Sequence, residues 1–218
     1  MHIELLVEEA SAEAALSELL PRIVGPRVTW AIHVHQGKRD LLTKLPDRLR
    51  AYARWLPRGW FIVVLVDEDR EDCLGLKRQL EQCAEGAGLS TATRRGPDQR
   101  VQVINRIAVE EIEAWFFGDV QALHKAYPRL PISLARKAKF RDPDAIDGGT
   151  WETLERVLQR AGYFRGGLAK IEAARCIARA MDPGRNRSRS FLCFRNSLVA
   201  LSRATGPLTG SGPCAQPS

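Results

Sequence analysis

Short apolar runs alternate along the first half of the chain with longer segments in which apolar residues recur every three or four positions. Runs of the first kind are typical of buried strands, and segments of the second kind are typical of amphipathic helices. Strands separated by helices of this length predict βαβ units, and hence an α/β fold with a three-layer, mainly parallel sheet. The expected strands are 2–7, 28–34, 60–66 and 101–109.

The residues at the segment ends refine the expected helices. Ser11 is a candidate N-cap for a helix over 12–20, which Pro21 is expected to end. Pro46 is expected to divide the helix at 40–55, because an internal proline removes a hydrogen bond. Two further helices are expected at 73–87 and from Glu110 to Phe117.

The strand pattern stops beyond residue 118, and a proline-punctuated basic region is followed by amphipathic helices at about 151–161, 168–181 and 191–204. We therefore expect an α/β core over 1–120 and a basic, mostly helical extension over 121–205 packed on that core. Residues 206–218 are uncharged and rich in Gly, Pro and Ser, which predicts a disordered tail.

Acidic residues follow three of the four predicted strands. In parallel sheets the functional crevice lies outside the carboxyl ends of the strands. The three clusters would share one edge if their strands are neighbours, which the sequence leaves open. The clusters are Glu8-Glu9, Asp67-Glu68-Asp69 and Glu110-Glu111 with Glu113.

Glu8 follows the first strand, and Glu13 lies about one turn into the next helix. One interpretation gives Glu8 to general acid–base chemistry or to a metal, with Glu13 as a second ligand. The alternative is electrostatic, because acidic residues in a first helical turn stabilise the helix dipole.

Five carboxylates occur within the six residues 67–72, a segment that repels itself unless a cation or Arg70 neutralises it. Asp67 and Asp69 are therefore candidate ligands of a hard cation such as Mg²⁺ or Mn²⁺. Alternatively, Asp69 or Asp72 caps the helix that follows.

Glu110 and Glu113 share a face at helical spacing, and either could complete the metal shell. The aromatic residues Trp115, Phe116 and Phe117 lie in an apolar helix, which favours a place in the core over a base-stacking surface.

Charge is distributed unevenly along the chain. Residues 1–120 contain 16 Lys and Arg against 19 Asp and Glu, whereas residues 121–218 contain 17 against 7. A basic second half could hold phosphate groups of a nucleic acid, although each basic segment could equally be a solvated surface. The candidate nucleic-acid-binding residues are Arg136, Lys137, Lys139, Arg141, Lys170, Arg187 and Arg189.

Several classes of protein are disfavoured by composition. No apolar run approaches membrane-spanning length and the amino terminus has no signal-peptide pattern, so we expect a cytoplasmic protein without a membrane partner. The five scattered cysteines form no CxxC pair, which disfavours a disulfide framework or a zinc site. No Ser-His-Asp triad, Walker loop or Rossmann glycine pattern is present.

The set of motifs resembles the Toprim domain shared by topoisomerases, primases and the overcoming-lysogenization-defect (OLD) nucleases. It resembles more closely the Toprim-like domain-of-unknown-function family numbered 4276, over roughly residues 2–204. The segments that carry the resemblance are 6–9 with Glu13, 64–69 with Asp72, 108–116, Lys170 and 189–191.

The resemblance implies a Mg²⁺-dependent phosphodiesterase or nuclease site in which Glu8 is the acid–base residue and Asp67 and Asp69 bind metal. Glu13 and Glu110 or Glu113 would be ligands of a second ion. It also implies a bacterial phage-defence or conflict system, in which a partner ATPase or defence protein is expected. One position differs from the Toprim pattern, because Glu9 occurs where a glycine usually follows the glutamate.

A second hypothesis is a non-catalytic regulatory or adaptor protein that keeps the Toprim fold and works with a partner protein. The sequence leaves a homodimer open.

Overall fold

The computed structural model describes residues 1–94 and 100–204, which contain one sheet of four parallel strands in the order β2-β1-β3-β4. The predicted parallel α/β sheet is confirmed. Because β1, β3 and β4 are neighbours, the three acidic clusters that follow them meet where the carboxyl ends of these strands lie. We call this end of the sheet the acidic edge, or carboxyl edge. The strands are β1 (His2–Val7), β2 (Thr29–Val34), β3 (Trp60–Asp67) and β4 (Val103–Ala108).

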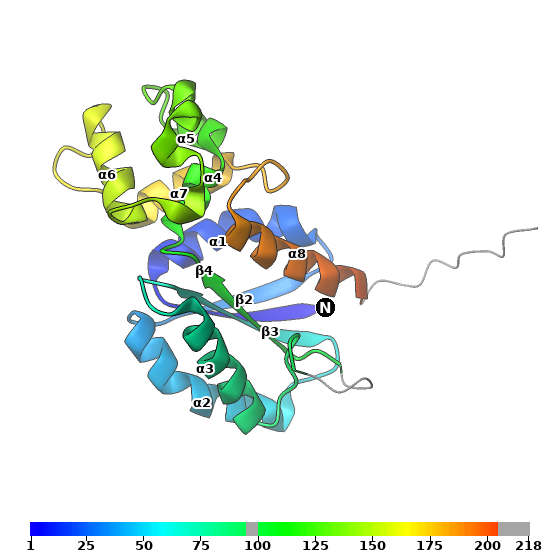
Figure 1. The fold of residues 1–218 in the computed structure, drawn as a ribbon. Coiled ribbons are helices and arrows are strands. Elements are labelled where there is room, and N and C mark those ends of the chain that lie inside the picture. The colour runs from blue at the N-terminus through cyan, green and yellow to red at the C-terminus, as the bar shows by residue number, and fades with distance from the viewer. Residues whose placement is uncertain (95–99, 205–218) are drawn as a thin grey trace, which may run out of the picture.

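Helices cover both faces of this sheet, as Figure 1 shows, so the predicted three-layer arrangement is also confirmed. Side chains alternate between the faces along each strand. On β1, Leu5 and Val7 pack toward α1 and α8, whereas Leu6 packs toward α2 and α3. The four helices are α1 (Ala10–Val24), α2 (Lys38–Trp55), α3 (Cys73–Gly86) and α8 (Arg189–Ala204).

Two proline expectations were wrong. Helix α1 continues through Pro21 to Val24, and α2 runs unbroken through Pro46. A proline removes one helical hydrogen bond, but the buried apolar stripe of each helix extends past it. In α2 that stripe includes Leu45 before the proline and Leu49 after it, both fully buried.

Helix starts also differ from expectation in two places. Glu9, and not Ser11, takes the N-cap position of α1, without a side-chain hydrogen bond. The helix expected from Glu110 begins at Glu113, because Glu110 has a positive φ of 58° that ends any helical turn there. Of the two alternative caps, Asp69 and Asp72, it is Asp72 that caps α3, since its side chain accepts a hydrogen bond from Leu74 N.

The extension is helical as predicted, with no strand after β4 among residues 109–204. It packs on the α1 face of the sheet, and Figure 1 places most of it beyond the carboxyl end of β4. Besides α8, the elements after β4 are α4 (Glu113–Gly118), which precedes the extension, α5 (Val120–Ala126), α6 (Thr150–Arg160), α7 (Lys170–Ala180) and three 3-10 turns at Ile132–Arg136, Ala138–Phe140 and Pro143–Ala145.

Aromatic side chains join α4 to α8. Trp115 and Phe117 are fully buried, and the Trp115 ring lies 5.2 Å from that of Phe191. The Trp115 indole also donates a hydrogen bond to Ser190 Oγ. These aromatic residues are therefore part of the core, as the sequence indicated.

Ser188 caps α8, as its hydroxyl accepts a hydrogen bond from Phe191 N at 3.1 Å. The tail predicted at 206–218 lies outside the described residues. None of the helices in the described ranges has the length and apolar character needed to cross a membrane.

Candidate active site

Glu8 is delivered by β1 to the carboxyl edge of the sheet and is nearly buried. Its Oε1 accepts a hydrogen bond of 2.8 Å from the backbone N–H of Asp67, at the end of β3. Burial raises the pKa of Glu8 to about 7, against a lowering contribution from that hydrogen bond, and the charge of Asp69 raises it further. Glu8 therefore exchanges a proton near neutral pH.

Asp67 ends β3 and is buried beside Glu8. Its pKa is raised well above the usual value, first by burial and then by the charges of Glu8, Glu113 and Asp69. These carboxylates follow three different strands, and the structure places Glu8, Asp67, Asp69 and Glu113 near one another.

Glu113 is the first residue of α4 and is 2% exposed. Burial raises its pKa to about 7, although the charge of Lys170 lowers it. Its Oε2 atom is buried and has no hydrogen-bond partner in the structure. An orphaned buried carboxylate oxygen is costly and is unusual outside functional sites.

Lys170, the first residue of α7, extends into the acidic edge from the basic extension. Its Nζ lies 3.3 Å from Glu9 Oε1 and 3.9 Å from Glu113 Oε1, and it stands over the Trp151 ring. Burial lowers the pKa of Lys170, but the charges of Glu113 and Glu9 raise it more. Glu9 therefore has a cationic partner.

Lys38 is a site residue that the sequence hypothesis missed. It begins α2, and its nearly buried ammonium lies 2.9 Å from Asp69 Oδ2 and donates to the Glu68 carbonyl. The signal was present, because Gly37 and Lys38 follow the β2 strand at the same carboxyl edge as the acidic clusters.

Three of the four non-glycine residues with positive φ in the described ranges lie in the two loops that carry the later acidic clusters. Asp69, Arg70 and Glu110 have φ of 50°, 64° and 58°, a region that non-glycine residues seldom adopt. Hydrogen bonds from Asp69 N to Glu110 O and from Glu110 N to Glu68 Oε2 tie the loops together. The loops are held in a strained arrangement at this edge.

Glu110 faces a separate hollow next to the buried carboxylates. The hollow is lined by the six residues Asp69, Arg70, Glu110, Glu111, Gly149 and Glu152. The expected shared face of Glu110 and Glu113 was wrong, because Glu110 precedes the helix. Glu111 has a structural partner, since its Oε2 accepts hydrogen bonds from Thr150 Oγ1 and Trp151 N at the start of α6.

Glu13 lies in the first turn of α1 and is half-buried. Its charge is not among the main ones that raise the pKa values of Glu8 and Asp67. The role of Glu13 as a metal ligand stays a prediction, and the helix-dipole interpretation matches its position in that turn.

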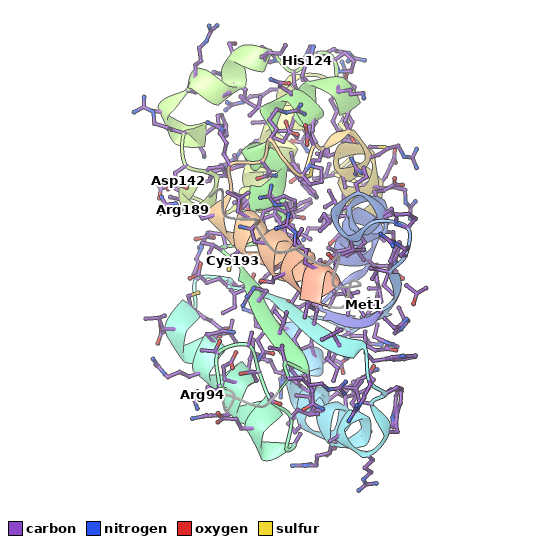
Figure 2. The ribbon with its side chains drawn as sticks, turned by 90° about the vertical axis from the view of Figure 1, so that its right-hand side faces the viewer. Met1, Arg94, His124, Asp142, Arg189 and Cys193 are labelled. Carbon is purple, nitrogen blue, oxygen red and sulfur yellow. The ribbon has the colours of Figure 1, made fainter. Side chains whose placement is uncertain are left out.

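The basic segments 136–141 and 187–189 lie side by side, although about fifty residues separate them in sequence. Arg187 donates to the Phe140 carbonyl, and Arg189 pairs with Asp142 at 2.7 Å. Figure 2 shows Asp142 and Arg189 together at the start of α8. The exposed members of this basic surface are Arg136, Lys137, Lys139, Arg141, Arg187 and Arg189. Lys170 differs from them because it lies among the carboxylates.

The chemistry of the acidic edge fits a divalent cation. Carboxylate oxygens are the ligands that Mg²⁺ and Mn²⁺ prefer, and the Oε2 of Glu113 lacks any other partner. Asp67, Asp69 and Glu113 are the residues that would hold such an ion, and Glu8 lies beside Asp67. In residues 1–94 and 100–204, no three His, Cys, Asp or Glu side chains form a metal-binding group as they stand.

The fold and this edge define an α/β protein with a buried carboxylate cluster at the carboxyl ends of its parallel strands. The chain belongs to the family described as "Domain of unknown function (DUF4276)", whose model matches residues 7–201. This match confirms the family resemblance found in the sequence.

One solved structure similar to this chain is the C-terminal region of the OLD protein of Xanthomonas campestris pv. campestris. The two chains are 16% identical with a TM-score of 0.43, and the alignment covers 93% of this chain and 97% of the other. No curated protein matches the chain.

The raised pKa values of Glu8 and Glu113, together with that of Asp67, predict that the metal-free protein loses stability as pH rises. Between about pH 4.5 and 7 the folded protein retains protons on Glu8 and Glu113 that the unfolded chain has released. The free energy of unfolding should therefore fall by about 2–4 kcal/mol from pH 5 to pH 8 through these groups. Urea unfolding at both pH values measures it.

Glu8→Gln is the matched control, because the amide has no charge but still presents an oxygen to Asp67 N. The fall should be smaller in this variant, because the contribution of Glu8 is removed. An equal fall in the wild-type protein and in Glu8→Gln would contradict the assignment of the proton to Glu8.

Proposed function

We propose that this protein is a Mg²⁺- or Mn²⁺-dependent phosphodiesterase that hydrolyses nucleic acid at the carboxyl edge of its sheet. The observation that carries the proposal is the burial of Glu8, Asp67 and Glu113 together, with every pKa raised. Such clustering of perturbed carboxylates costs stability and is typical of functional sites.

Each residue has a distinct role in this proposal. Asp67 and Asp69 would hold the ion, with Glu113 as a further ligand, and a bound ion would supply neutralisation of charge on the phosphate and a lower pKa of water. Glu8, whose pKa is about 7, accepts the proton of the attacking water. The water oxygen bonds to phosphorus as the bond from phosphorus to the leaving oxygen breaks, and that oxygen takes up a proton.

Lysines act at both sides of the cluster. Lys38 holds the exposed Asp69 carboxylate at 2.9 Å, and Lys170 offsets Glu9 and Glu113. A phosphate that approaches the edge would otherwise meet uncompensated negative charge, which lowers its affinity. In this proposal Lys170 compensates for a glutamate, Glu9, where a glycine is usual.

The basic surface beside the start of α8 would bind the phosphate backbone of the substrate. Lys137 and Arg141 are exposed, and no described residue forms a hydrogen bond or ion pair with either side chain. Converting both to glutamine should weaken binding and reduce the slope of log affinity against log salt by about 1.5–2. Fluorescence anisotropy over a series of salt concentrations measures this slope.

Arg54→Gln with Arg58→Gln makes the same change in net charge at the C-terminal end of α2 and the turn after it, in the other helical layer. This control should leave the slope unchanged. Equal slopes for the two double variants would show that the basic surface does not contact phosphate.

A cleavage assay tests the proposal. The purified protein is incubated with single- and double-stranded DNA and RNA, with Mg²⁺, Mn²⁺ or a chelator. The proposal predicts cleavage of at least one substrate that the chelator abolishes. Absence of metal-dependent cleavage on all four substrates would contradict it.

The two lysines also support a second candidate, a non-catalytic adaptor that works with a partner ATPase or defence protein. Lys38 and Lys170 already place ammonium groups within the acidic edge, where they could replace a metal. Under this alternative, metal ions should not raise the melting temperature, whereas a metal site gains stability through binding.

A further inference from the structure

The two outermost strands of the sheet, β4 and β2, differ in the hydrogen bonds that their outward-facing backbone groups form. On the outer edge of β4, the Val103 N–H donates to Ser90 O and the Val103 carbonyl accepts from Ala92 N. Further along, the ammonium of Lys77 donates to the Asn105 carbonyl at 2.9 Å. The chain therefore covers much of this edge with its own groups.

Within the described residues, the outer side of β2 has no such hydrogen bonds. The N–H groups of Thr29 and His35 donate inward, to Met1 O and Val7 O. Because bonding directions alternate along a parallel strand, the backbone groups of Trp30, Ile32 and Val34 face outward. No described residue forms a hydrogen bond with them on that side.

The residues of β2 are of the kinds that allow a strand to pair with another strand. Its sequence, Thr-Trp-Ala-Ile-His-Val, contains no proline, no lysine and no acidic residue. Such residues are the usual means by which exposed edges avoid association. Trp30 and Ile32 are only partly buried against the core, and Val34 is 37% exposed. Partial burial leaves apolar surface beside the unpaired backbone.

We propose that β2 pairs with β2 of a second copy of this chain, antiparallel and centred on Ile32, to form a continuous sheet across a two-fold axis. In this register Ile32 faces Ile32 of the second copy, and Trp30 faces Val34. These are the residues whose backbone groups point outward, so each forms the doubly hydrogen-bonded pair of an antiparallel ladder.

The sequence around β2 is complementary to itself in this register. All three outward pairs are apolar, and all their side chains lie on the α1 face of the sheet, where the two copies would extend one another's core. The flanking charges avoid one another, since Arg27 would face Gly37 and Lys38 would face Pro26. This self-complementarity is the reason for choosing a second copy as the partner.

Each carboxylate cluster in such a dimer belongs to a single chain. The antiparallel arrangement points the two acidic edges in opposite directions along the joined sheet. Cleavage activity and dimer formation are therefore separable, and failure of one proposal does not imply failure of the other.

Sedimentation equilibrium of the full chain tests the proposal. The wild-type protein should be a dimer, and Ile32→Lys should weaken dimerisation at least tenfold, because two like charges would face each other at the centre. Ile132→Lys, at an exposed isoleucine in the extension, is the matched control and should leave the dimer intact. Val34→Lys, at a more exposed position, serves if Ile32→Lys does not fold.

Ile32→Cys provides a geometric test. Cα atoms of a hydrogen-bonded antiparallel pair lie about 5.5 Å apart, within the range that a disulfide spans. Mild oxidation should give a dimer that peptide mapping assigns to residue 32, and Ile132→Cys should not give one. A wild-type protein that is monomeric at all concentrations, or a dimer that survives both lysine variants, would overturn the proposal.

Discussion

Asp67→Asn should abolish metal-dependent cleavage and at the same time make the metal-free protein more stable. The amide keeps the size of the side chain but removes a buried charge that burial and the neighbouring charges of Glu8 and Glu113 disfavour. A site that holds unfavourable charge for function gains stability when that charge is removed. We expect a loss of at least about 10³-fold in rate, because metal coordination supplies several kcal/mol.

The cleavage rate and the melting temperature of the metal-free protein are measured on the same preparation. Asp72→Asn is the matched control, because Asp72 is exposed in the same acidic run, caps α3 and pairs with the exposed Arg78. It should cleave within about threefold of wild type, since asparagine is also a good cap. Asp67→Asn protein that cleaves normally would exclude Asp67 as a ligand.

Lys170→Met should destabilise the protein at neutral pH. Glu113 is fully buried, and Lys170 is the cation that most lowers its pKa. Without Lys170 the pKa of Glu113 rises further above 7, so its carboxyl takes up a proton, and this limits the loss to about 1 kcal/mol at pH 7.5. Urea unfolding at pH 7.5 measures the loss.

A double-mutant cycle separates the charge effect from lost packing. Adding Glu113→Gln to Lys170→Met should restore most of the stability, because no buried charge remains to be compensated. Additive effects of the two substitutions would show instead that Lys170 stabilises the fold through its stem against Trp151.

The acidic edge was predictable because it follows from elements that the sequence shows clearly. Each of three apolar strands is followed by an acidic residue: Glu8, Asp67 or Glu110. When parallel strands are neighbours, their carboxyl ends lie side by side, so the residues that follow them lie close together. The sequence could not establish that β1, β3 and β4 are neighbours, since strand order depends on how the crossovers pack. The structure supplies that order.

Other features depend on contacts between distant parts of the chain. Lys170 reaches Glu113 only because α7 packs on α1, and the sequence pattern assigned it to phosphate alone. The positive φ of Glu110 arises from hydrogen bonds to the loop after β3, which overcome the helical spacing of the glutamates. The prolines of α1 and α2 are tolerated for a similar reason, since tertiary burial outweighs one missing hydrogen bond.

The most direct test of the central claim is isothermal titration of the metal-free protein with Mn²⁺ at pH 8, where Glu8 and Glu113 are mostly ionised. The account predicts saturable binding to wild-type protein, a loss of affinity of at least tenfold in Asp67→Asn, and weaker binding at pH 6, because protons compete with the ion. Equal binding of Mn²⁺ to wild-type protein and Asp67→Asn, or no binding to either, would contradict it.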